Sequence, residues 1–128
     1  MKFSLFTEIQ CAAGSAPAER LEEFMEQAEL ADRLGFHTYW IAEIHCQPKF
    51  SLLSAPYVVL GAVAQRTKRL RLGVAVNTLP VHHPVQLAEE AAMLDLVSRG
   101  EWILPQAVAT RTAARMSASV QIINRRMT

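Results

Sequence analysis

Two hydrophobic periods alternate along the first hundred residues of the chain. Short apolar runs rich in β-favouring side chains occupy residues 2–9, 37–45 and 70–79, and they predict three strands. Between and after them, apolar side chains recur at helical spacing over residues 17–34, 56–65 and 84–100, which predicts three helices. Proline opens each predicted helix, and glycine ends the first and the third, as helix boundaries favour.

The regular order of strand and helix predicts a parallel sheet with right-handed crossovers, so the fold class is α/β. A doubly wound sheet and a (β/α)8 barrel both fit this pattern. No Gly-x-Gly-x-x-Gly follows the first strand, which weighs against a dinucleotide-binding sheet. A complete barrel takes ~250 residues. The 128 residues of this chain therefore hold three to four βα units and cannot close a barrel.

The distribution of charge indicates a boundary just after Gly100. Residues 1–101 contain nine basic and twelve acidic side chains, a net charge of −3, whereas the rest contain four arginines and no acid, a net charge of +4. Aromatic side chains also stop, at Trp102. We therefore expect an ordered α/β portion over residues 1–100 and a divergent, weakly structured basic tail over residues 101–128.

Composition excludes several classes of protein. A total charge of +1 argues against a nucleic-acid partner, and apolar stretches such as residues 57–64 fall short of the ~20 residues of a membrane span. The amino terminus lacks the long apolar block of a signal peptide. Cys11 and Cys46 do not make a disulfide framework, and we expect free thiols in a cytoplasmic protein.

Candidate chemistry lies at the carboxyl ends of the predicted strands, where parallel α/β proteins place their sites. Polar side chains follow all three strands there: Glu8, Gln10, Cys11, Glu43, His45, Cys46, Asn77, Thr78, His82 and His83. Glu43 and His45 are two apart on a strand, so they should leave the same face as an acid–base pair or as a buried structural hydrogen bond.

Two further clusters have plainer explanations. His82 and His83 precede Pro84, where an imidazole could cap the helix or pack in the loop. A metal site made from Glu43, His45 and these two histidines matches no ligand spacing, so we expect none. The basic side chains at residues 66–71 lie at the amino end of the third strand, which predicts a solvated turn rather than a phosphate site.

Several motifs in order resemble the bacterial luciferase-like monooxygenases. They are residues 1–6 (MKFSLF), 40–45 (WIAEIH), 71–76 (RLGVAV), 79–84 (LPVHHP), 87–95 (LAEEAAMLD) and 98–100 (SRG). The resemblance covers residues 1 to about 100. It implies an incomplete (β/α)8 TIM barrel from the amino-terminal portion of a flavin-dependent monooxygenase.

The resemblance also implies the chemistry. Glu43 and His45 would be catalytic, Ala75, Val76 and Asn77 would lie against the flavin, and His83-Pro84 would match a family motif at a helix start. The cofactor would be reduced FMN from a flavin reductase, which acts with O2 on a small organic substrate. The alternative cofactor would be a deazaflavin (coenzyme F420), as in a sister branch of the family.

Two departures from the family pattern qualify these expectations. Ile44 stands where the luciferases proper have a catalytic histidine. The family's glycine-rich fourth strand is reduced to residues 101–104, so we expect a truncated or frameshifted chain. The alternative function is a non-catalytic remnant or half-barrel module, whose open sheet should form a homodimer or another oligomer.

Overall fold

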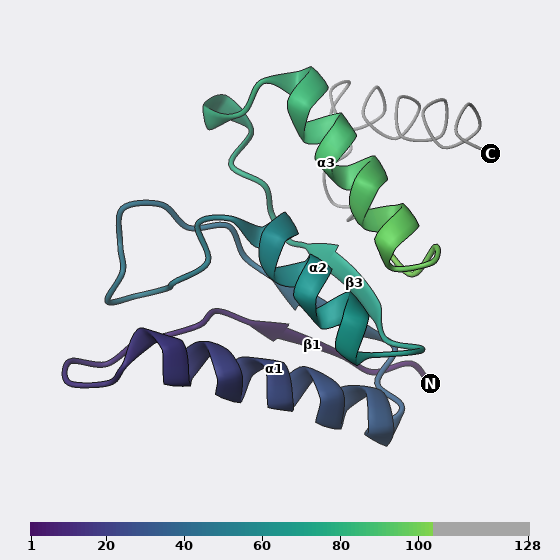
Figure 1. Cartoon of the computed structure of the whole chain (residues 1–128), viewed down its shortest axis with the longest axis horizontal. Helices are drawn as coiled ribbons and strands as arrows, with labels where there is room; N and C mark the ends of the chain where they lie inside the picture. Colours follow the sequence, from purple (N-terminus) through teal and green to yellow (C-terminus); the bar gives the residue numbers. More distant parts are fainter. Residues whose placement is uncertain (104–128) are drawn as a thin grey trace.

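The computed structural model describes residues 1–103, which form three strand–helix pairs (Figure 1) followed by a single β-bridge residue, Trp102. The elements are β1 (Ser4–Thr7), α1 (Pro17–Leu34), β2 (Thr38–Ile41), α2 (Pro56–Arg66), β3 (Arg71–Val74), the 3-10 helix η1 (Leu79–Val81) and α3 (Pro84–Val97). The predicted order of elements is confirmed. Most of the predicted tail lies outside the described residues, and the boundary after Gly100 stays a prediction.

The sheet order distinguishes a barrel from a doubly wound sheet. The strands pair in parallel in the order β1-β2-β3. The Leu72 N–H donates to the carbonyl of Glu101 and the Ile103 N–H donates to the carbonyl of Leu72, both at 2.8 Å, in a parallel bridge with Trp102. The next segment therefore joins the sheet beside β3. The common dinucleotide-binding sheet instead returns to β1, so the observed order favours a barrel.

The strands are shorter than the hydrophobic pattern predicts. β2 ends at Ile41 rather than at residue 45, and β3 ends at Val74 rather than at residue 79. Beyond these points the polar groups of Glu43 and Asn77 bond to each other instead of continuing the ladder. Glu43 and His45 consequently lie on a loop, and the prediction that they occupy a strand is wrong.

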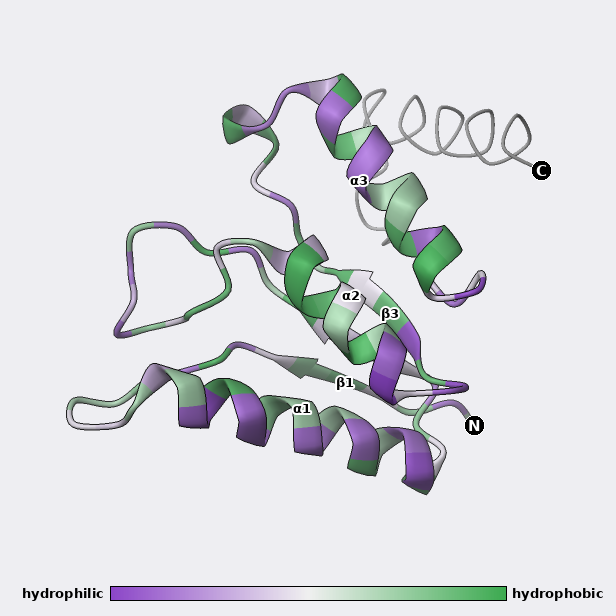
Figure 2. Cartoon of the chain, in the orientation of Figure 1, coloured by the Kyte–Doolittle hydropathy of each residue, from purple (hydrophilic) through white to green (hydrophobic). Residues whose placement is uncertain are grey.

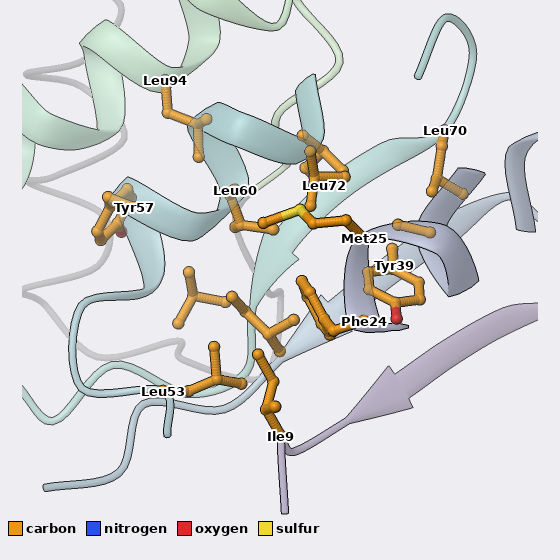
Figure 3. Close-up of a cluster of buried hydrophobic side chains, with 14 of the residues drawn as sticks. Ile9, Phe24, Met25, Tyr39, Leu53, Tyr57, Leu60, Leu70, Leu72 and Leu94 are labelled. Atoms are coloured by element: carbon orange, nitrogen blue, oxygen red, sulfur yellow. The ribbon is translucent and has the colours of Figure 1, made fainter. Parts of the chain in front are cut away.

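One face of the sheet packs against the helices and forms the core. Side chains of alternate strand positions, including Tyr39 and Leu72, meet Phe24 and Met25 of α1 and Leu60 of α2 (Figure 3). Helix α1 alternates hydrophobic and hydrophilic bands, whereas α2 is mainly hydrophobic until its last turn (Figure 2). This difference fits their places, because α2 packs against α1, α3 and β3.

The opposite face of the sheet is open. Phe6, Trp40 and Gly73 share one register position on it, and Phe6 is 56% exposed. The Trp40 ring lies so close over Gly73 that a Cβ there would overlap it. This face corresponds to the inside of a barrel, so the described residues form an open segment of the barrel wall. No helix among residues 1–103 is long and apolar enough to cross a membrane.

Two glycines offer a matched test of backbone conformation. Gly35 ends α1 at φ 79°, as predicted, whereas Gly61 lies inside α2, and a Cβ would meet nothing within 4 Å at either position. We expect Gly35→Ala to lower the free energy of unfolding by about 1 kcal/mol, because alanine resists a left-handed conformation. Gly61→Ala should instead raise it by about 0.5–1 kcal/mol through helix propensity. Urea titrations of both variants measure whether the free energy of unfolding falls in Gly35→Ala and rises in Gly61→Ala. A lower free energy of unfolding in both variants would contradict the prediction.

Candidate functional site

A polar cluster forms beyond the carboxyl ends of β2 and β3. Glu43 comes from the loop after β2, Asn77 and Thr78 lie between β3 and η1, and His82 directly follows η1. These segments meet because β2 and β3 are neighbours in the sheet and end at the same edge. The cluster therefore joins residues that lie up to 39 positions apart in the chain.

Glu43 is the centre of this cluster. Its Oε1 accepts hydrogen bonds from Nε2 of His45 at 2.6 Å and from Nε2 of His82 at 2.5 Å. Its Oε2 accepts from Nδ2 of Asn77 at 3.1 Å and from the backbone N–H of Thr78 at 2.8 Å. The Glu43 side chain has no exposed surface, whereas His45 is 34% and His82 17% exposed. A buried carboxylate thus faces two imidazoles that solvent can reach.

Hydrogen bonds keep the Glu43 carboxylate ionised. Burial raises its pKa, but the bonds from His45, the Thr78 amide, Asn77 and His82 lower it, and the net pKa is below the usual value. Within residues 1–103, the ion-pair partners of Glu43 are the two histidines, and no lysine or arginine lies within ion-pair distance of it. The charge of Glu43 is therefore compensated by hydrogen-bond donors and imidazoles alone.

The same bonds determine the histidine tautomers. A carboxylate accepts only, so His45 and His82 each carry a proton on Nε2 when they bond to Glu43. In the neutral ring this leaves a lone pair on Nδ1. Each imidazole can therefore accept a proton at Nδ1 while Glu43 stabilises the resulting cation.

Tyr57 extends the cluster into α2. Its hydroxyl donates to Oδ1 of Asn77 at 3.0 Å, which leaves the amide Nδ2 of Asn77 directed at Glu43. Burial raises the pKa of Tyr57, so it remains a neutral donor. Neither Tyr57 nor the Thr78 amide was predicted to join a Glu43 cluster. The signal available in the sequence was a tyrosine hydroxyl in the first turn of a helix that is apolar until its last turn.

The segment Ala75–Asn77 lies beside the cluster. The Ala75 N–H donates to the Ile41 carbonyl at 2.8 Å, and the Ala75–Val76 peptide bond is cis. Val76 is 53% exposed. The exposed Val76 side chain and the Asn77 side-chain amide, which bonds to Glu43, are therefore neighbours in the chain at this edge of the sheet.

Other sequence candidates stay outside the cluster. His83 occupies the N-cap position of α3, but its side chain makes no capping hydrogen bond, so the capping expectation is wrong for this residue. Cys11 is buried, Cys46 is exposed, and both are free thiols, as predicted. The amides of Lys68 and Arg69 bond to the Asp32 carboxylate at the amino end of β3, in an exposed turn.

Comparison with known proteins identifies the family. The chain matches the luciferase-like monooxygenase family over residues 1–104. It is 36% identical over 101 residues to the oxygenase component of flavin-dependent trigonelline monooxygenase from Acinetobacter baylyi, covering 78% of this chain and 28% of that protein.

Solved structures agree with this match. The monooxygenase RslO1 from Streptomyces bottropensis superposes with a TM-score of 0.77 at 26% identity, over 94% of this chain and 42% of that chain. The oxygenating constituent of 3,6-diketocamphane monooxygenase from Pseudomonas putida, solved with FMN, has a TM-score of 0.75 at 22% identity over 97% of this chain and 38% of that chain, and it supports the fold. The chain thus spans 28% of its trigonelline relative and forms part of a TIM barrel. It belongs to the luciferase-like monooxygenase family.

Proposed function

We propose that this chain supplies the first βα units of a flavin-dependent monooxygenase site. In this proposal Glu43 and His45 handle protons at the substrate, and Ala75, Val76 and Asn77 contact the flavin ring. The observation that carries the proposal is the buried Glu43 carboxylate, which orients two accessible imidazoles beside the end of β3. Family membership supplies the redox chemistry that these side chains lack.

The residues at this edge suit a flavin ring. The exposed Val76 offers an apolar contact for a flat ring, and Asn77 offers an amide at its side. The basic side chains Lys68, Arg69 and Arg71 lie at the amino end of β3, so they are poorly placed for a phosphate group at the carboxyl end. We therefore expect the described residues to bind the ring of FMN, and we expect none of these three basic side chains to hold its phosphate.

The chemistry requires a group outside the chain. Ala75, Val76 and Asn77 would hold reduced FMN delivered by a separate reductase, and the flavin would supply the two electrons with which O2 gives one oxygen atom to a small organic substrate. A deazaflavin is the alternative cofactor. His45 would take a proton from the substrate at Nδ1 while Glu43 holds its Nε2 proton.

A binding titration tests this proposal. The purified chain is titrated anaerobically with reduced FMN and, in parallel, with reduced deazaflavin. We expect a Kd of about 100 µM for FMN, because the basic residues of β3 are not placed to hold the phosphate. Val76→Asp should raise the Kd at least about fivefold by placing a charge against the ring. Val58→Asp, at a 75% exposed valine of α2, is the matched control and should leave it unchanged.

Two results would overturn the proposal. One is the absence of binding at about 1 mM flavin, and the other is an equal effect of the two aspartate variants. Either result favours the second candidate, a non-catalytic half-barrel module. The observation behind that candidate is the open face of the sheet, where Phe6 is 56% exposed.

A further inference from the structure

We propose that Glu43, His45 and His82 form a binding site for a divalent transition-metal ion such as Zn2+. Each side chain offers one ligand atom, and the three atoms all lie within 4.8 Å of one another. Two imidazole nitrogens and one carboxylate oxygen are a donor set that Zn2+, Co2+, Ni2+ and Fe2+ accept. This inference goes beyond the flavin proposal but shares Glu43 and His45 with it, so a bound ion would occupy the His45 Nε2 atom whose proton Glu43 holds in that proposal.

The carboxylate is oriented as a metal ligand would be. Asn77 and the Thr78 amide hold Oε2 of Glu43, and Tyr57 in turn holds Asn77, so Oε1 is directed at both imidazoles. Outer hydrogen bonds of this kind typically orient first ligands and support metal affinity. Such bonds are present here on Oε2, which Asn77 and the Thr78 amide hold without any contribution from lysine or arginine.

Charge also favours a cation. The Glu43 side chain has no exposed surface, and among the described residues it has no lysine or arginine partner. Because the pKa of Glu43 lies below its usual value, the buried side chain carries a negative charge. A divalent ion would compensate this charge more strongly than the two hydrogen bonds do.

The site is open on the imidazole side. His45 and His82 are partly exposed, and His82 also lines a cavity of about 430 Å3 between α2 and α3. An ion can therefore reach the two rings from solvent, and water can occupy the remaining coordination positions. Three protein ligands with an open position are the arrangement of reactive rather than structural zinc sites.

Only small movements are needed to bind the ion. The Nε2–Oε1 distances of 2.6 and 2.5 Å are those of hydrogen bonds, whereas ligand atoms around Zn2+ stand about 3.0–3.4 Å apart when each bond is about 2.0–2.1 Å. Rotation of the two partly exposed rings can provide this separation. Each ring then moves its Nε2 proton to Nδ1, and the freed Nε2 lone pair binds the metal, so neutral rings release no net proton.

Calorimetric titration of the full chain with Zn2+ at pH 7.5, after treatment with a chelator and without flavin, tests the site. We expect one ion per chain with a Kd of about 10 µM or tighter. His82→Asn and His45→Asn should each raise the Kd at least about tenfold, because each removes one of three ligands. His83 and Cys46 are exposed, lie near the cluster in the chain and are of residue types that can ligate metals, but they are not among its three ligands. His83→Asn and Cys46→Ser should therefore leave the Kd unchanged.

Co2+ provides a second measurement. Nitrogen and oxygen coordination should give visible ligand-field absorption in the parent chain that is lost in His82→Asn, with circular dichroism confirming that both chains are folded. The proposal is overturned if Zn2+ does not bind at about 100 µM, or if His83→Asn or Cys46→Ser weakens binding as much as His82→Asn does. Since no flavin is present, neither outcome bears on the monooxygenase proposal.

Discussion

Leu60→Ala is expected to lower the free energy of unfolding by about 2–5 kcal/mol. Leu60 has no exposed surface and belongs to the core cluster between α1, α2 and the sheet (Figure 3). Its truncation removes buried methyl groups and leaves a cavity that rigid neighbours cannot fill completely. Small domains are stable by only about 5–15 kcal/mol, so this one change should remove a large share of the total.

Val58→Ala is the matched control for this change. Val58 lies two residues earlier in the same helix and is 75% exposed, so its truncation should alter stability by no more than about 0.5 kcal/mol. Urea unfolding monitored by circular dichroism measures both variants. Equal effects would mean that α2 does not pack in the core as described.

The second large effect is expected at Glu43. Glu43→Ala should lower the free energy of unfolding by about 2–3 kcal/mol, because His45, His82, Asn77 and the Thr78 amide together lose their shared acceptor. Glu43→Gln retains the side-chain shape and one acceptor oxygen, and it should lose less than half as much. Glu43→Ala should lose more stability than Glu43→Gln because it leaves more hydrogen-bond donors without an acceptor.

Glu89 supplies the control for the Glu43 series. It is an exposed glutamate on α3, and Glu89→Ala should change stability by no more than about 0.5 kcal/mol. Thermal unfolding followed by circular dichroism compares the three variants. A Glu43→Ala chain as stable as the Glu89→Ala chain would show that the cluster is not a stabilising unit.

Much of the fold could be predicted because its signals are local. Proline at positions 17, 56 and 84 marks the three helix starts, and Gly35 marks the end of the first, where the left-handed conformation occurs as predicted. Hydrophobicity located the strands but overestimated their length. Apolar residues such as Ile44 and Val76 continue the β-favouring pattern after the ladder has ended, and the pattern carries no information on where polar side chains interrupt it.

The site was predicted less completely because its contacts are distant in the chain. Glu43 and His45 were recognised together since only one residue separates them. His82 lies 39 positions from Glu43, and Tyr57 lies 20 positions from Asn77, so no spacing rule joins them. Only the parallel pairing of β2 with β3 brings these segments to one edge. The general placement of sites at the carboxyl ends of parallel strands predicted that edge but not which side chains bond to each other.

The strand order of the sheet affects how the chain can fold while it is being synthesised. Each strand pairs with the one made just before it, and the segment at Trp102 pairs with β3. Each strand after β1 therefore emerges from the ribosome with a partner already available, and no earlier pair must open to admit it. The sheet can therefore grow by addition of each new strand at the β3 edge. The contacts between the first βα units can form before the later part of the chain has been synthesised.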